Sequence, residues 1–460
     1  MKLAYSWISN KQEEIARAKS DGDLKRAEEL GEELVHSNFA QTVAVQTVAN
    51  NVGSRSPGLS KESFKTNYQN MVFKLNDIVT DPKSYSSSEA APLGRIYIKK
   101  KDGILRPISI PSYTDRCLQA LYKMAVEPFY EEMADISLYG FRPIRGVSWA
   151  VGRTLNAIKN PWAKYSFVVE VDIMGCFDNI DHDFIRQITP VIPRHILDEW
   201  LNCGYIEREG DKVLPTEAGV PKGGILSPLL ANLALDGLET HIRERIKQAK
   251  TGSKGSGFCR YADDMVIFVT TYKNAVVALE AVKELLIIRG LQVKEAKTSI
   301  INIHDSSFDF VGFTFSLVFR HNMKRKVARI SIPKLAIRKF RDKINLVFKS
   351  NKAVSTKIRE ANSVIRGWAN AYKIAHDSHL IFNSLRYWIW KQYFTMCFRK
   401  LSNSNPKANK TRISKMVWTS FFTKLSNGVW PATKDKNDNL ITLVNISSIE
   451  FPRPILTNKA

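Results

Sequence analysis

The feature that most constrains this chain is the segment YADD at residues 261–264, two acids set between apolar runs. Phe258 precedes it and residues 265–269 (MVIFV) follow it, a pattern typical of strand, tight turn, strand. Neighbouring side chains on a strand point to opposite faces, so a turn is needed to bring two adjacent acids near one point. Two carboxylates there are costly without a positive charge, and a hard divalent cation is the natural candidate. An ordinary Asp-Asp turn is the alternative for these four residues alone.

A second acidic element lies 91 positions before Asp263, at Asp172. Residues 167–173 form an apolar run typical of a buried strand, and Asp172 stands near its end. If this strand lies beside the 261–264 turn, the acids of both elements meet at one point. Two Mg²⁺ ions held there could activate a hydroxyl nucleophile and stabilise a pyrophosphate leaving group. The alternative is that Asp172 caps a helix that begins near Met174.

A glycine-rich segment lies between the two acidic elements, at residues 218–232 (AGVPKGGILSPLLAN). Its glycines allow backbone N–H groups to approach a ligand closely. Ser227 and Pro228 then open a helix, with serine as the cap and proline at the first position. A glycine-rich loop before a helix is by itself a weak indication of phosphate binding.

The charge of the chain is unevenly distributed. The net charge is +23 and the pI is about 9.7, which indicates a polyanionic partner. Residues 322–430 hold 24 Lys and Arg against 3 Asp and Glu, so this region carries +21 of the total. We therefore predict a separate basic C-terminal module that binds nucleic acid rather than an anionic membrane.

Cysteine usage and hydropathy exclude several classes of protein. The five cysteines are widely spaced and form no CxxC pair, so neither a disulfide framework nor a zinc site is supported. The N-terminus has no long apolar segment, and no stretch reaches 18 apolar residues. We expect a protein of the bacterial cytoplasm or an organelle matrix, neither secreted nor bound to a membrane.

The order of predicted elements favours the α+β class, because strands and helices are mixed without regular βαβ alternation. Helices are predicted at residues 11–50 with an interruption at 21–23, at 114–135, at 181–201 with a break at Pro190 and Pro193, and at 275–289. One long helix is predicted at 227–248, and a basic helical series from 333 to about 401. Strands are predicted at 167–173, in a hairpin at 95–111 with its turn at Asp102-Gly103, and as a pair at 308–319. Predicted loops cover 51–62, 83–93, 251–257 and 402–415.

The order of these segments resembles the group II intron-encoded reverse transcriptases, and matching stretches run through most of the chain. The stretches that resemble the fingers motifs are 95–119 and 139–146, those of the palm are 168–182, 219–239, 289–298 and 308–315, and the catalytic hairpin is 259–268. Residues 11–30 and 44–54 resemble the N-terminal segment of this subfamily, and 364–375 its maturase region.

The resemblance implies a right-hand polymerase, with fingers and palm on an antiparallel sheet and an α-helical thumb/maturase domain after them. We predict domains at 1–75 (N-terminal helical extension), 76–320 (fingers and palm), 321–430 (basic thumb/maturase) and 431–460 (C-terminal tail). The implied function is RNA-directed DNA polymerase, with an intron-RNA-binding maturase role in splicing and mobility. The implied cofactors are two Mg²⁺ ions, with Mn²⁺ as a substitute. The implied partners are an RNA template and primer, intron RNA, deoxynucleoside triphosphates and a DNA target.

The resemblance also assigns roles to single positions around the catalytic hairpin. Asp172, Asp263 and Asp264 match the metal-binding carboxylates, and Ile173 is assigned to the same metal and nucleotide sites. Phe177 matches an aromatic gate that crowds a 2′-hydroxyl, and its alternative is a phenylalanine of the core.

Further positions are assigned to nucleotide binding: Lys99, Arg106, Lys222, Gly223 and Lys297. Planar arginine binds phosphate in a bidentate manner, which suits Arg106. The alternative for Lys99 and Arg106 is a solvated hairpin, and the alternative for Lys297 is an ordinary surface charge. The roles of Asp178 and Arg116 stay open. Both could line the site, and the alternatives are a helix cap for Asp178 and a surface charge for Arg116.

The chain departs from the family pattern at two places. Lys222 stands where the family usually has Gln, near the nascent base pair, so it could add a phosphate contact, alter fidelity, or mark lowered or redirected activity. No Cys follows Cys397 and no His follows His379, so we expect no zinc-associated HNH endonuclease domain.

In the basic region, lysines and arginines alternate with aromatic residues. Basic side chains neutralise phosphates and aromatic rings stack on unpaired bases, although several of these rings are expected in the core. The residues assigned to nucleic-acid binding are Arg366, Trp368, Tyr372, Lys410 and Arg412.

Two other functions stay open. The first is a maturase that supports splicing with little polymerase activity, for which Lys222 is the main indication. The second is a bacterial reverse transcriptase associated with defence or CRISPR, which the N-terminal and maturase-like segments disfavour.

Overall fold

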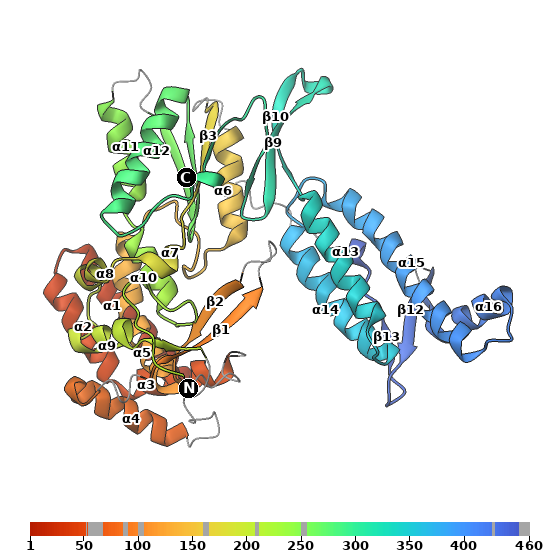
Figure 1. The fold of residues 1–460 in the computed structure, drawn as a ribbon, viewed down its shortest axis with the longest axis horizontal. Coiled ribbons are helices and arrows are strands. Elements are labelled where there is room, and N and C mark those ends of the chain that lie inside the picture. The colour runs from red at the N-terminus through yellow and green to blue at the C-terminus, as the bar shows by residue number, and fades with distance from the viewer. Residues whose placement is uncertain are drawn as a thin grey trace. The chain divides into compact units, whose positions relative to one another are not determined.

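The computed structural model describes residues 1–51, 53, 68–85, 91–99, 105–159, 165–207, 211–249, 255–425 and 428–449. It has two compact units, one made of residues 1–153 and 160–302 and the other of 154–159 and 303–460 (Figure 1). Both contain helices and sheets, which confirms the predicted α+β class. None of the helices described is long and apolar enough to cross a membrane.

The first unit begins with helices that pack around one buried helix, α5 (Tyr113–Met133). A capping box between Ser112 and Asp115 begins α5. The predicted helical region 11–50 is confirmed, with breaks at residues 21–23 and at Ser37, which caps the next helix. The surrounding helices are α1 (Lys2–Ser20), α2 (Leu24–His36), α3 (Asn38–Asn50) and α4 (Tyr68–Thr80), followed by the short η2 (Pro82–Ser84).

The predicted hairpin at residues 95–111 is present as two antiparallel strands, β1 (Leu93–Lys99) and β2 (Leu105–Ile110). A short strand, β4 (Tyr205–Ile206), pairs with β1 in parallel. The predicted turn at Asp102-Gly103 lies outside the described residues.

A four-stranded antiparallel sheet in the order β5-β6-β3-β7 forms the centre of the first unit. The strands are β3 (Phe167–Asp172), β5 (Ser256–Tyr261), β6 (Asp264–Val269) and β7 (Ser299–Asn302). Helices α11 (Leu238–Gln248) and α12 (Tyr272–Ile287) pack on this sheet, side by side in Figure 1. Strand β6 is buried from Met265 to Val269 and exposed only at Asp264, so burial of this apolar run favours the register in which Asp264 stays at the exposed end of the strand.

The prediction of one long helix at 227–248 is wrong. The segment forms α10 (Ser227–Ala234) and α11, separated by Gly237 at φ 79°, a left-handed conformation that ends an α-helix. The predicted helical region 181–201 is confirmed together with its predicted break at Pro190 and Pro193, as α8 (His182–Ile188) and α9 (Arg194–Asn202). Two helices come before α8 in the chain: α6 (Val147–Lys159), which was not predicted, and the single turn α7 (Cys176–Asn179). The short helix η3 (Glu295–Lys297) precedes β7.

The second unit combines a three-stranded sheet, a helical bundle and a second small sheet. The predicted strand pair at 308–319 is confirmed as β8 (Phe308–Phe310) and β9 (Phe313–Arg320), and β10 (Arg325–Ser331) extends it after η4 (His321–Met323). The helices are α13 (Lys334–Lys349), α14 (Val354–Tyr372), α15 (Ser378–Ser404) and α16 (Lys410–Phe421). The second sheet has β11 (Phe422–Leu425), β12 (Gly428–Lys434) and β13 (Leu440–Thr442), and η5 (Ile446–Ser448) follows it.

The predicted basic loop at 402–415 is mostly wrong, because α15 continues to Ser404 and α16 begins at Lys410. The side chain of Asn409 accepts a hydrogen bond from the N–H of Arg412 and so caps α16. The small C-terminal sheet was not predicted, and the predicted boundary after residue 430 falls inside β12.

Two β-branched residues of the first unit have a left-handed backbone, which costs roughly 1–2 kcal/mol for a residue with a Cβ. Ile144 has φ 62° and its side chain is 96% exposed, so no packing offsets this cost. Val191 has φ 67°, and its two methyl groups lie against Gly31 at the edge of the core.

We predict that glycine substitutions at these two positions change the free energy of unfolding in opposite directions. Ile144→Gly relieves strain without loss of packing, so the free energy of unfolding rises by about 1 kcal/mol. Val191→Gly loses its contacts with the core, so the same quantity falls by about 1–2 kcal/mol. Chemical denaturation measures both, and a decrease for Ile144→Gly would contradict the assigned backbone conformation.

Candidate active site

The antiparallel register of β3 and β6 places Asp172 directly opposite Asp264. Asp263 lies in the turn that joins β5 to β6, next to Asp264 in the chain. Opposed Cα atoms lie about 4.5–5.5 Å apart and consecutive ones 3.8 Å, so the Cα atoms of Asp172 and Asp263 are within roughly 9 Å. The three aspartates predicted to meet are therefore neighbours, and the helix-cap alternative for Asp172 does not describe its position at the end of β3.

The turn that carries Asp263 is held in place by a neighbouring segment. Ala262 has a left-handed backbone at φ 57°. The N–H of Tyr139 donates to the carbonyl oxygen of Arg260 (2.9 Å), and the N–H of Arg260 donates to that of Ser137 (2.9 Å). A Cβ on Gly140 would lie 2.4 Å from the Ala262 nitrogen, so only glycine allows this approach.

A fully buried arginine lies beneath the same turn. Arg260 Nη1 is 3.4 Å from the Asn232 side-chain oxygen and 3.4 Å from the Ala262 carbonyl oxygen. The Asn232 side chain in turn donates to the Gly140 carbonyl oxygen (2.8 Å). These contacts connect α10, the 137–140 segment and the turn. The sheet and α10 therefore both fix the position of Asp263.

The electrostatics of the aspartates favour a cation. Desolvation by the surrounding protein, followed by repulsion from Asp263 and Asp172, raises the pKa of Asp264 to about 6. The ammonium of Lys297 lies 3.3 Å from an Asp172 carboxylate oxygen and is the nearest opposing charge. Lys297 was predicted to lie near the triphosphate, and the structure brings it to the aspartates.

The donor set suits a hard divalent ion, because it offers carboxylate oxygens from two opposed strand ends and the adjacent turn. No three His, Cys, Asp or Glu side chains in the described part of the chain gather closely enough to enclose a metal ion by themselves. Mg²⁺ usually binds through one or two carboxylates and completes its shell with waters and substrate phosphates, so such a closed cluster is not required. Ile173, also assigned to the metal, is buried and bridges to Val293.

The glycine-rich segment is clamped between α7 and β2. The N–H of Val220 donates to the Phe177 carbonyl oxygen (2.6 Å), and the N–H of Gly223 donates to that of Ser109 (3.0 Å). A Cβ on Gly223 would lie 2.3 Å from the Ser109 oxygen. The glycine therefore permits close packing of two backbones. Its N–H already donates to Ser109, so it is not free to bind a ligand.

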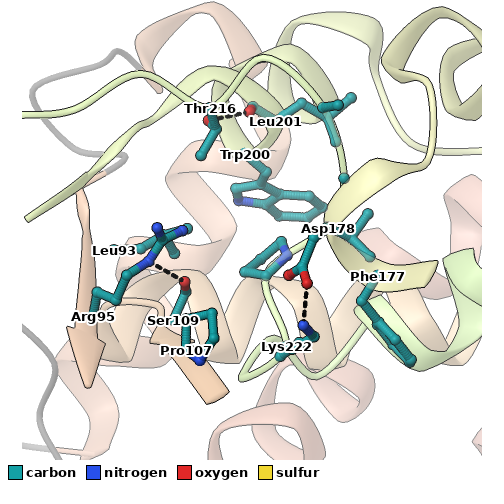
Figure 2. A pocket seen from close by; sticks show the side chains of 14 residues that line it. Leu93, Arg95, Pro107, Ser109, Phe177, Asp178, Trp200, Leu201, Thr216 and Lys222 are labelled. Carbon is teal, nitrogen blue, oxygen red and sulfur yellow. Dashed lines mark hydrogen bonds and ion pairs between the residues drawn. The ribbon is translucent and has the colours of Figure 1, made fainter. Parts of the chain in front are cut away.

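These clamped segments enclose a pocket of about 60 Å³ (Figure 2). Lys222 and Asp178 form an ion pair within it, and on the other side Arg95 donates to the Ser109 hydroxyl (3.4 Å) and lies 3.2 Å from the Tyr205 ring centre. The lining residues are Leu93, Arg95, Pro107, Ser109, Phe177, Asp178, Trp200, Leu201, Thr216, Ala218, Gly219, Val220, Pro221 and Lys222.

The pocket contains residues that sequence reasoning missed. Of the positions assigned to nucleotide binding, Phe177 and Lys222 line it, whereas Arg106, Ile173, Gly223 and Lys297 do not. Arg106 is exposed on β2 and does not line the pocket, and the side chain of Lys99 lies outside the described residues. Arg95 does line it, as a basic residue of the predicted hairpin strand. Its place in that strand was a usable signal for Arg95, whereas nothing in the sequence marked Trp200.

In the second unit, the residues assigned to nucleic-acid binding differ in exposure. The Trp368 ring packs on Phe340 (4.6 Å) and Tyr372 (4.8 Å), and burial raises the pKa of Tyr372. Both rings thus contribute to the aromatic core of the unit. Arg366 on α14 and both Lys410 and Arg412 on α16 are exposed.

Three family models match the chain. They are a reverse transcriptase (RNA-dependent DNA polymerase) model over residues 98–315, an N-terminal domain of reverse transcriptase over 2–75, and a group II intron maturase-specific domain over 337–416. Their order along the chain is the order in which the resembling segments occur.

Curated relatives agree with these matches. The group II intron-encoded protein LtrA of Lactococcus lactis is 32% identical over 206 residues, or 44% of this chain, which spans only 33% of that relative. The protein YkfC of Escherichia coli is 27% identical over 62% of this chain and 80% of its own. Maturase-like protein 1 of Euglena gracilis is 22% identical over 93% of this chain and 86% of its own.

Among solved structures, a telomerase from Candida albicans aligns over 73% of this chain and 65% of its own at 13% identity. Its TM-score of 0.39 is too low to carry an argument. The family models and the curated relatives show that the chain belongs to the family of group II intron-encoded reverse transcriptases and maturases.

Proposed function

We propose that this protein is an RNA-directed DNA polymerase that also binds its intron RNA as a maturase in splicing and mobility. The observation that carries the proposal is the pairing of Asp172 with Asp264 beside the Asp263 turn. The reverse transcriptase model covers this region, and the maturase-specific model covers most of the basic helices of the second unit.

Reverse transcriptases generally depend on divalent metal ions, and we propose two Mg²⁺ ions, replaceable by Mn²⁺, held by Asp172, Asp263, Asp264 and Ile173. When bound, they would lower the pKa of the primer 3′-hydroxyl and neutralise the leaving pyrophosphate. Lys297, beside Asp172, would balance the remaining negative charge of the triphosphate.

The other residues would position the nucleotide. Phe177 is half-buried against the core, and its ring would limit the room at the sugar 2′ position. Gly223 would contribute close backbone approach rather than a hydrogen bond, because its N–H donates to Ser109. Lys99 and Arg106, on the β1–β2 hairpin, remain candidates for the triphosphate.

We propose an RNA template with its primer, deoxynucleoside triphosphates, intron RNA and a DNA target as partners. The +21 charge of residues 322–430 supports the polynucleotide partners, because phosphate neutralisation supplies most of the non-specific affinity for nucleic acid. Arg366, Lys410 and Arg412 are exposed and are proposed as phosphate contacts. Trp368 and Tyr372 lie on the same helix as Arg366 and would support that helix by packing rather than by stacking on bases.

A maturase without polymerase activity is the second candidate. The observation in its favour is that Lys222, assigned to nucleotide binding, is already engaged by Asp178. Primer extension separates the two candidates.

We predict that Asp263→Asn lowers primer extension on an RNA template by at least about 100-fold, because it removes a metal-binding charge at the reacting phosphate. Binding of intron RNA by filter retention is expected to stay within about twofold. Asp183→Asn, an equal charge change at an exposed position on α8, serves as the control and is expected to retain extension. If the wild-type protein and Asp263→Asn are equally inactive with Mg²⁺ and with Mn²⁺, the protein is a maturase only.

We predict that Phe177→Ala relaxes sugar discrimination. Removal of the ring opens space for a 2′-hydroxyl, so the ratio of kcat/KM for a deoxynucleotide to that for the matching ribonucleotide should fall by about tenfold or more. The change should come from faster ribonucleotide incorporation. An unchanged ratio with normal extension would place Phe177 in the core alone.

We predict a pH-dependent stability difference between the wild-type protein and Asp264→Asn when divalent ions are chelated. The pKa of Asp264 is raised from 3.8 to about 6, so the folded state binds this proton more tightly than the unfolded state. Its favourable contribution is therefore full below about pH 4 and is lost as the pH rises to about 6. The Tm of Asp264→Asn minus that of wild type should increase across this window and then level off, and a constant difference from pH 4 to 8 would contradict the assignment.

A further inference from the structure

The Lys222–Asp178 pair joins two groups in very different environments. Figure 2 shows the two side chains pointing toward each other inside the pocket. The Lys222 side chain is 13% exposed, whereas that of Asp178 is 45% exposed. Most of the Lys222 side chain is covered by surrounding residues, so few waters can replace a lost partner, whereas a half-exposed carboxylate can be hydrated at little cost. Lys222 therefore depends on the pair more than Asp178 does.

The backbone fixes the two residues beside each other. Asp178 lies on α7 and Lys222 in the turn after Val220, and these segments are joined by two hydrogen bonds, from Gly219 to Ile180 (2.8 Å) and from Val220 to Phe177 (2.6 Å). Gly219 has φ 84°, and a Cβ there would lie 2.5 Å from the backbone of Asp178. The backbone hydrogen bonds thus hold Asp178 and Lys222 next to each other, so the ion pair is not a chance contact of mobile side chains.

The pair and Asp263 share a common neighbour, the Cys176 thiol. Burial raises the pKa of the Cys176 thiol to about 12, and Asp263, Asp178 and Lys222 all act on the same thiol. Phe177, the proposed sugar gate, is the residue directly before Asp178 and lines the same pocket. The pocket of about 60 Å³ is too small for a whole nucleotide but adequate for a phosphate group or waters.

The other cation of the pocket has different partners. Arg95 donates to the Ser109 hydroxyl and lies over the Tyr205 ring, and no carboxylate of the described residues forms an ion pair with it. Of the two cations that line the pocket, Lys222 is the one held by a negative charge. An arriving polyphosphate would compete with that charge.

We propose that Lys222 exchanges Asp178 for a phosphate oxygen of the incoming nucleoside triphosphate, and that Asp178 thereby lowers nucleotide affinity as an internal competitor. This inference rests on the proposed polymerase function and deepens it. The ammonium keeps one strong partner throughout, and the carboxylate returns to water. Asp178 is a positioning residue in this scheme, because it acts on the nucleotide through Lys222.

A double-mutant cycle on the full chain tests the exchange. We measure KM for dGTP in primer extension for wild type, Asp178→Asn, Lys222→Gln and the double variant. We expect Asp178→Asn to lower KM by about 3- to 10-fold and Lys222→Gln to raise it by a similar factor. In the Lys222→Gln background, Asp178→Asn should change KM by less than about twofold. The proposal is overturned if Asp178→Asn changes KM equally with Lys222 present and with Gln in its place. It is also overturned if Asp178→Asn raises KM in the protein that retains Lys222.

Two further variants exclude simpler explanations. Asp183→Asn removes one negative charge from an exposed carboxylate on α8 and should leave KM within about twofold. If it lowers KM as much as Asp178→Asn does, the effect is one of net charge and the exchange is wrong. Lys222→Met removes the hydrogen bond that Gln could keep to Asp178, and it should abolish the effect of Asp178→Asn as completely as Lys222→Gln does.

A binding measurement makes the test independent of polymerisation. Inorganic triphosphate is titrated into the full chain by calorimetry, and Asp178→Asn should bind it several-fold more tightly than wild type only when Lys222 is present. If wild type extends no primer but this pattern holds, the polymerase proposal fails and the exchange stands. If extension is normal and Asp178→Asn binds triphosphate no more tightly than wild type, the exchange fails and the polymerase proposal stands.

Discussion

The candidate site depends on one backbone constraint, the antiparallel pairing that sets Asp172 opposite Asp264. Opposed carboxylates repel each other, so the register must be fixed by something stronger than the site itself. The apolar run of β6 supplies this, because residues 265–269 are all buried and only Asp264 before them is exposed, so a slip along the strand would bury a carboxylate or expose a core side chain. The sheet thus holds a charge arrangement that no isolated turn would keep, and the raised pKa of Asp264 reflects the cost.

A second constraint acts on the turn. Gly140 is packed against Ala262, and Arg260 with Asn232 joins the turn to α10, so Asp263 is held by contacts from three separate parts of the chain. Burial of a charged Arg260 and a left-handed Ala262 both oppose stability. Their presence directly below the aspartates is understandable if the position of Asp263 matters more than the stability lost there.

Local patterns in the sequence predicted the elements that build the site, but not the contacts between them. The acidic hairpin, β3 and most helices follow from apolar periodicity and from turn residues. The break at Gly237 and the second helix at Lys410 were missed, because a glycine in a helical pattern is ambiguous and a polar segment can still form a capped helix. The meeting of Asp178 with Lys222 depends on tertiary hydrogen bonds of Gly219 and Val220, which no local pattern encodes. The site roles themselves remain predictions.

The candidate site contains two ion pairs, each between an aspartate and a lysine. Asp172 is paired with Lys297, and Asp178 is paired with Lys222, so both carboxylates are balanced by lysines of the protein. In the first pair the lysine is the more exposed partner, at 61% against 23%, and in the second pair the carboxylate is. A ligand that brings both phosphates and cations offers new partners to three of these groups: the phosphates take the two lysines, and the cations take Asp172 with its neighbours. Asp178 is left to water, which its 45% exposure allows at little cost. Binding such a ligand therefore leaves no covered charge without a partner, which is the condition for polar groups to be exchanged in a site of low dielectric.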